Sequence, residues 1–132
     1  MPIAIAMGLP SLREIFEEKY YEDLPGGILE SFGRLFKQDL RLYVCPALDA
    51  QTHAPVNVHS IQVAPHLQHL YAYILENGFV KALDTVKVEY LSIYSHEVLD
   101  KIRRGDTDWE TMVPTQVAEI IKARRFFHWQ PR

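Results

Sequence analysis

The chain has 132 residues and a mass of 15.3 kDa, and its hydrophobic residues make up 48% and its charged residues 23%. This balance is typical of one globular domain with one core rather than of a disordered segment. A net charge of −3 argues against a dedicated nucleic-acid binder, which normally carries a basic excess. We therefore expect a single domain over residues 1–132, with nucleic acid an improbable partner.

Cys45 is the only cysteine, so an intrachain disulfide is excluded and a reducing compartment is favoured. The apolar start of the chain lacks the basic residues of a signal peptide, and Pro10 follows it closely. No stretch approaches the roughly 20 apolar residues that span a bilayer. These features predict a soluble, cytoplasmic protein that does not enter membranes.

In chain order, apolar runs and their turn residues predict strands alternating with helices. The first half should contain a short buried strand over 3–7, a helix from Ser11 to about Tyr21, a helix over 28–37 and a strand over 40–45. The second half should contain a short strand within 56–63, a helix over 67–75 and a strand within 86–93. A helix that Ser95 caps should follow and stop at Gly105, and a last helix should begin near Pro114. This alternation predicts an α/β fold: a small sheet with flanking helices, some parallel pairing and a helical C-terminal end.

The segment from Ile93 to Gly105, followed by Met112-Val113-Pro114 and by Val117 and Ile121, carries the most informative pattern. It resembles the C-terminal end of nicotinamide and nicotinate mononucleotide adenylyltransferases, in which I-S-S-T-x-x-R opens a helix and I-x-x-G and L-V-P-x-x-V-x-x-Y-I follow. The resemblance covers about thirty residues. Two positions depart from the pattern, because His96 replaces the threonine and Leu99 replaces the arginine.

The resemblance implies a Rossmann-like fragment that acts together with a partner chain or is a diverged nucleotide-binding domain. The reaction it implies is adenylyl transfer from MgATP to a mononucleotide. Helix N-terminal amides and hydroxyls would hold phosphate, and arginines would add charge. The nucleotide-binding residues implied here are Ser95, His96, Arg103 and Arg104. Because Leu99 replaces the arginine, we expect the isolated chain not to make NAD from NMN and ATP; its catalytic residues stay unassigned.

The same family carries an H-x-G-H motif, and His66-Leu67-Gln68-His69 imitates it. Gln68 replaces the glycine that lets the backbone approach phosphate closely. We interpret the match as coincidental and give His66 and His69 second place as nucleotide ligands. Their shared helix face also suits a metal, but no cysteine or positioned carboxylate accompanies them, so we expect no metal site.

The alternative function is a non-enzymatic protein-interaction domain. Aromatic residues at Tyr20-Tyr21 and from Phe126 to Trp129 would then contact a partner chain. Large exposed rings are rare on monomers and common in the cores of interfaces. We therefore expect a dimer or a hetero-complex in which Trp129 loses most of its exposure.

Overall fold

A computed structural model describes residues 1–131, and they form two compact units, Met1–Val88 and a C-terminal unit that begins at Glu89. Each unit has its own set of buried side chains. The expectation of one core was therefore wrong. No side chain from Leu83 to Tyr90 is buried.

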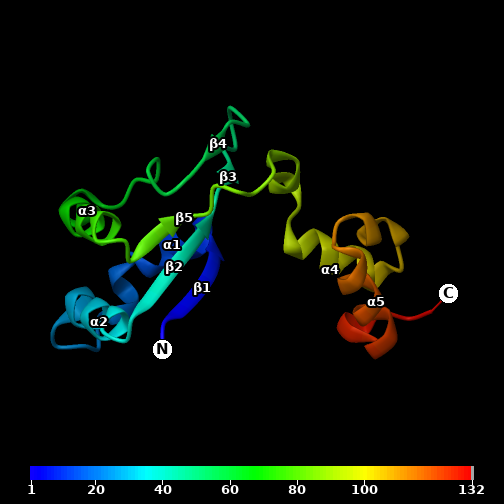
Figure 1. Cartoon of the computed structure of the whole chain (residues 1–132), viewed down its shortest axis with the longest axis horizontal. Coiled ribbons are helices and arrows are strands. Elements are labelled where there is room, and N and C mark those ends of the chain that lie inside the picture. The colour runs from blue at the N-terminus through cyan, green and yellow to red at the C-terminus, as the bar shows by residue number, and fades with distance from the viewer. Residues whose placement is uncertain (132) are drawn as a thin grey trace. The chain divides into compact units, whose positions relative to one another are not determined.

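The Met1–Val88 unit contains a three-stranded, entirely parallel sheet in the order β1-β2-β5 (Figure 1). Its elements are β1 (Ile3–Gly8), α1 (Leu9–Ile15), the 3₁₀-helix η1 (Glu18–Tyr21), α2 (Gly27–Phe36), β2 (Leu40–Cys45), the 3₁₀-helix η2 (Pro65–Leu67), α3 (Gln68–Glu76) and β5 (Val80–Ala82). Parallel neighbours need a crossover connection, and here helices supply it. The predicted α/β fold class, with a small sheet and flanking helices, is confirmed.

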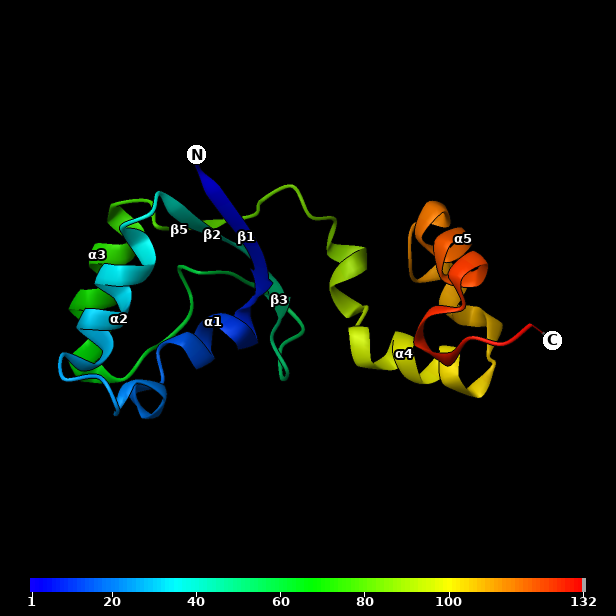
Figure 2. The same cartoon turned by 90° about the horizontal axis from the view of Figure 1, so that it is seen from below.

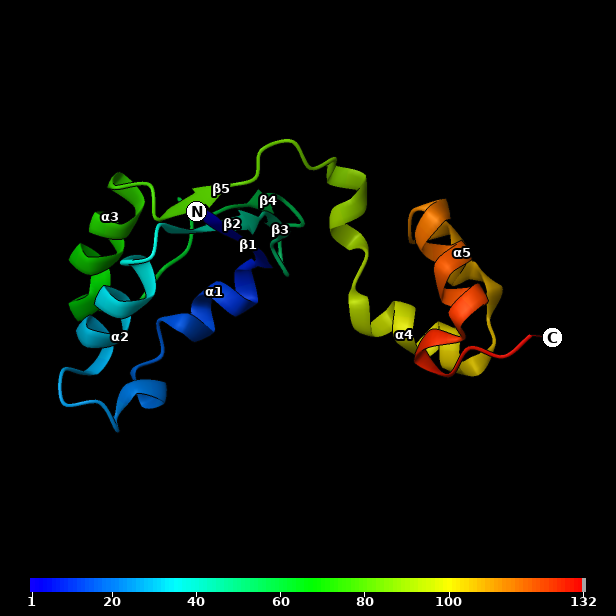
Figure 3. The same ribbon diagram turned by 60° about the horizontal axis from the view of Figure 1, so that its bottom comes forward.

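Helices α1, α2 and α3 lie on one face of this sheet (Figures 2 and 3). Alternation along β2 explains this placement, since Leu40, Leu42 and Val44 are buried and pack with all three helices, whereas Arg41, Tyr43 and Cys45 on the opposite face are only half-buried. Aromatic rings fill the space between helices, with Phe16 in edge-to-face contact with Phe32 at 5.1 Å and with Tyr71 at 5.0 Å between ring centroids.

Several predicted elements differ from the observed ones. The first helix ends at Ile15 instead of about Tyr21, because Glu17 is extended and Phe16 turns into the aromatic cluster. Within 56–63 only Val56 is in a strand, β4 (Pro55–Val56), which pairs with β3 (Ala47–Leu48); an Asn57 turn follows and sends Val58 and Ile61 into the core. The strand predicted within 86–93 is wrong, since a 3₁₀-helix, η3 (Val88–Ser92), occupies it.

The C-terminal unit is helical and packs around one tryptophan. Its elements are α4 (Ser95–Arg104), the 3₁₀-helix η4 (Thr107–Thr111), α5 (Thr115–Arg124) and the 3₁₀-helix η5 (Phe126–His128). Trp109 is 1% exposed and lies among Val98, Ile102, Ala118 and Ile121. Gly105 ends α4 in the left-handed conformation with φ 73°, the usual role of glycine after a helix. The predicted helical C-terminal end is confirmed.

Tyr71 gives a pH-dependent prediction for the Met1–Val88 unit. Its buried hydroxyl donates a hydrogen bond to the Val58 carbonyl at 2.6 Å, and burial raises its pKa to about 12. An unfolded tyrosine ionises near pH 10, so between pH 10 and 12 the unfolded chain loses a proton that the folded chain keeps. The free energy of unfolding should therefore fall by about 1.4 kcal/mol per pH unit in this window.

The Tyr71→Phe variant provides the control, because phenylalanine cannot ionise. It should lose about 1 kcal/mol at neutral pH through the missing hydrogen bond, but its stability should decline less steeply above pH 10. Urea unfolding followed by circular dichroism at several pH values measures both slopes. Parallel slopes in the two proteins would contradict the assignment of the alkaline loss to Tyr71.

Candidate functional site

The N-terminus of α4 holds two of the predicted nucleotide ligands, Ser95 and His96. Tyr94, with extended φ and ψ, is the N-cap residue, so the expectation that Ser95 caps the helix was wrong. The Tyr94 carbonyl accepts hydrogen bonds from the amides of Glu97 and Val98, and the His96 ring stacks on Tyr94 at 5.7 Å. Glu97 in the first turn is already negatively charged, which weakens the attraction of this helix end for phosphate.

The other two predicted ligands, Arg103 and Arg104, lie at the C-terminus of α4. They line a pocket of about 350 Å³ together with His128, Gln130 and other residues of the Gly105 turn and the C-terminal segment. We call this the basic pocket and define it by Arg103, Arg104 and His128. Both arginines are more than half exposed, and each forms an ion pair with Asp100, at 4.0 Å and 3.9 Å.

The structure does not bring the four predicted residues together. Arg103 follows Ser95 by eight positions along α4, which at a rise of 1.5 Å per residue places their backbones roughly 12 Å apart. The helix dipole also differs between the two ends, being positive at Ser95 and negative at Arg103. Ser95 and His96 therefore form one surface and the basic pocket another.

The backbone beside the basic pocket is unusual. Arg125, Phe127 and His128 have positive φ angles of 51°, 56° and 66°, a conformation that non-glycine residues rarely adopt. Such conformations persist only where the surrounding structure enforces them, and they concentrate at functional sites. With these backbone angles the chain after α5 turns back toward α4, and His128 lies beside Arg103 and Arg104 in the basic pocket.

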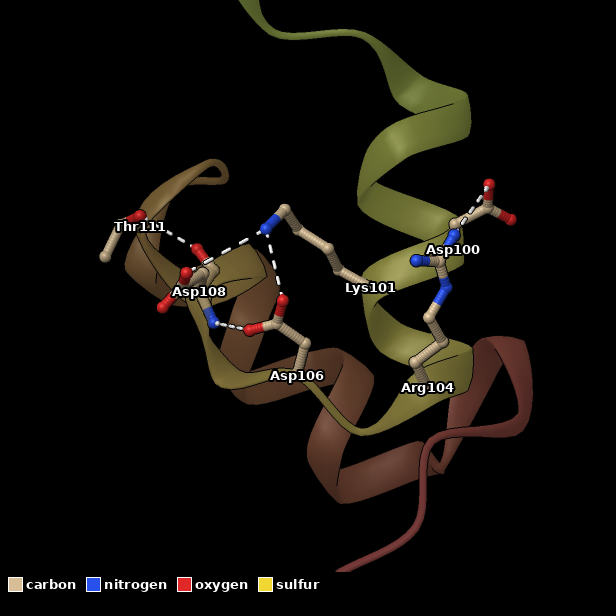
Figure 4. A network of polar contacts seen from close by, with 6 residues as sticks. All are labelled: Asp100, Lys101, Arg104, Asp106, Asp108 and Thr111. Carbon is tan, nitrogen blue, oxygen red and sulfur yellow. Dashed lines mark hydrogen bonds and ion pairs between the residues drawn. The ribbon is translucent and has the colours of Figure 1, made fainter.

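Lys101 connects α4 to η4 in the same unit (Figure 4). Its ammonium donates a hydrogen bond to Asp106 at 3.2 Å and lies 3.8 Å from Asp108. Asp106 caps η4 by accepting from the Asp108 amide at 2.9 Å. Lys101 is thus engaged in holding the turn after α4 (Figure 4). Lys101 does not line the basic pocket, whereas Arg103 and Arg104 do.

His66 and His69 lie in the other unit, on η2 and α3. The His66 Nε2 is 2.8 Å from a Glu18 carboxylate oxygen, and both histidines are exposed. Within residues 1–131, no three His, Cys, Asp or Glu side chains are grouped in a way that could hold a metal ion. The contact with Glu18 gives His66 a local structural role.

The C-terminal aromatic residues divide between the core and the surface. Trp129 is half-buried and packs on the core of its own unit, whereas Phe126 and Phe127 are 43% and 50% exposed. Helix α5 has apolar residues on two sides, since Ala118 and Ile121 are buried while Val117 and Ile120 remain exposed. This unit therefore presents apolar surface that its own core does not use.

The edge of β1 is a further feature, which the sequence interpretation missed. A buried strand was expected, but every residue of β1 except Met7 is exposed. The Ile3 amide donates to Asp39 on the β2 side, so alternation turns the N–H and C=O groups of Ala4 and Ala6 away from β2. We call this side of β1 the open edge. It carries no charged residue, although most natural edge strands are protected by charge or proline.

The fold and these surfaces define an α/β protein with a small all-parallel sheet and a helical C-terminal unit. None of the helices described is long and apolar enough to cross a bilayer. Comparison with known proteins gives no match, whether to a protein family, to a curated protein or to a solved structure. The resemblance to mononucleotide adenylyltransferases therefore stays a prediction from the sequence.

Proposed function

We propose that this chain is a protein-interaction module whose Met1–Val88 unit accepts a strand from a partner at the open edge of β1. The observation that supports it most is an uncharged, exposed strand at the edge of an entirely parallel sheet. Parallel sheets normally have both faces covered and long strands buried. Here β1 is exposed at every residue except Met7. Strand addition is a common means of peptide recognition.

The side-chain pattern of β1 supports the same proposal. Ile3 and Ile5 lie in register with Leu40 and Leu42, and so belong to the face that the helices cover. Yet they are 42% and 40% exposed, because α1 follows only the far end of the strand. A strand added beside them would extend the apolar core while pairing the free backbone groups of Ala4 and Ala6.

An uncharged strand-length peptide of alternating valine and threonine tests this proposal. Added at millimolar concentration, it should shift the amide resonances of Ala4 and Ala6 and slow their hydrogen exchange. Ala4→Pro is the blocking variant, because it removes an N–H that faces the open edge and leaves the β1–β2 hydrogen bonds intact. Ala4→Val keeps the N–H and should still respond. No change at Ala4 and Ala6, at a protein concentration where the chain is monomeric, would refute strand addition.

A second candidate function, binding of phosphate-containing nucleotides, is supported by the basic pocket. Arginine pairs two donors with phosphate oxygens, and a protonated histidine adds a further donor. The two arginines and His128 converge there from segments separated in sequence. In this proposal MgATP binds through its phosphates and the chain itself performs no transfer, in keeping with Leu99 at the position of the family's arginine.

Titration with MgATP, followed by amide resonances, separates the two surfaces of α4. We expect shifts at 102–105 and 128–130, with an affinity that decreases as salt is raised. Arg103→Gln with Arg104→Gln should abolish them, whereas Arg34→Gln in α2 should not. Shifts at Ser95 and His96 instead would favour the helix N-terminus, and an unaltered spectrum would contradict nucleotide binding.

A further inference from the structure

We propose that the strand added at the open edge is β1 of a second copy, paired antiparallel about a twofold axis at Ile5. This inference rests on the proposed function and names its partner. The resulting assembly is a homodimer with one continuous six-stranded sheet, built from two sheets of three strands. Symmetric dimers with self-complementary interfaces are the commonest oligomers of soluble proteins.

The backbone of β1 determines the register. The free N–H and C=O groups belong to Ala4 and Ala6, because the N–H and C=O groups of Ile3, Ile5 and Met7 point toward β2. Residues that exchange both hydrogen bonds in an antiparallel pair lie directly opposite each other. Pairing Ala4 of one copy with Ala6 of the other, and the reverse, uses all these groups and places the twofold axis at Ile5.

The side chains suit this register. Ile5 then lies opposite Ile5 of the second copy and Ile3 lies opposite Met7, all on the face that carries the core. In non-hydrogen-bonded pairs the side chains approach most closely, so the partly exposed isoleucines would cover one another. The opposite face receives only alanines at the pairing positions, whose small side chains leave no steric conflict.

Charge is compatible with a second copy and disfavours a charged partner strand. Residues 3–8 contain no ionisable side chain, so twofold pairing brings no like charges opposite each other although the whole chain has a net charge of −3. The nearest ion pair, Arg41 with Asp39, lies at β2, one strand away from the new contact. A partner strand with an alternating charge pattern would instead set ions against Ile3 or Ile5.

The strength of this dimer follows from its size. A single strand pair covers less than the roughly 800 Å² per partner of a standard interface. We therefore expect association in the micromolar range, visible as a mass that rises with concentration from 15.3 kDa toward twice that value. Light scattering over a dilution series measures it, and hydrogen exchange at Ala4 and Ala6 should slow in parallel.

Introducing a positive or a negative charge at Ile5, on the twofold axis, is the decisive test. Ile5→Lys and Ile5→Glu should each be monomeric, because each would place two like charges opposite each other. An equimolar mixture of the two should dimerise, since Ile5 faces itself only in the proposed register. Amide spectra check that both variants fold, and Leu29→Lys on the exposed surface of α2 is the matched control that should still dimerise.

The outcomes separate this inference from the proposed function. A monomer at millimolar concentration, or a dimer unaffected by Ile5→Lys and Ile5→Glu, overturns the second copy as partner. If the valine–threonine peptide still shifts Ala4 and Ala6, strand addition stands and the partner is a different chain. If both experiments fail, strand addition at β1 is refuted as well.

Discussion

Replacing Trp109 with alanine should unfold the C-terminal unit. Trp109 is 1% exposed and is the largest side chain of a core that otherwise consists of a few aliphatic residues. Truncating a buried tryptophan costs about 3–5 kcal/mol. A unit of this size rarely has more than about 3–5 kcal/mol of stability from its core, so the loss should exceed what it can tolerate.

Amide spectra would show this result as a collapse of dispersed resonances from α4 and α5. Resonances of β1 and β2 should stay, because the Met1–Val88 unit has a separate core. Val117→Ala is the matched control on α5, where a 41% exposed side chain should cost within about 0.5 kcal/mol. Loss of the β1 and β2 resonances together with those of α4 would indicate that the two units fold cooperatively.

The second large effect is expected at Phe32, in the centre of the aromatic cluster. Its ring is 4% exposed and lies 5.1 Å from Phe16, 6.1 Å from Tyr21 and 5.8 Å from Phe36. Phe32→Ala should lower the free energy of unfolding of the Met1–Val88 unit by about 3–5 kcal/mol. Lost edge-to-face contacts and the cavity left behind both contribute.

Urea unfolding measures this loss as a lower midpoint with an unchanged slope. Leu29→Ala is the control, since Leu29 precedes Phe32 by one turn of the same helix but is 67% exposed. It should shift the midpoint little. An equal effect of the two variants would mean that the ring contacts of Phe32 do not hold α2 against the sheet.

Local sequence patterns predicted the elements in which the spacing of hydrophobic residues coincides with the spacing of buried residues. The α2 helix has Ile28, Phe32 and Phe36 at helical spacing and all three are buried, and β2 alternates buried and half-buried residues as its sequence does. Glycine after Arg104 ended α4 as expected. These elements were predictable because hydrophobic periodicity and turn residues act within one segment.

Tertiary structure decided the remainder. The apolar run Ile3–Met7 indicated a buried strand, but its position at the edge of the sheet leaves it exposed, and strand order is not encoded in the run itself. Val80–Ala82 forms β5 although it is only three residues long, because pairing with β2 stabilises it. The run within 86–93 contains the 3₁₀-helix η3 and belongs to neither of the two sheets described.

The candidate sites divide in the same way. The resemblance to mononucleotide adenylyltransferases pointed to Arg103 and Arg104, whose charges near a helix end are visible in the sequence. Only the folded chain adds His128, because a strained turn after α5 returns it to the end of α4. Only the sheet topology reveals the open edge, because free backbone groups depend on which strands are neighbours and not on which residues a strand contains.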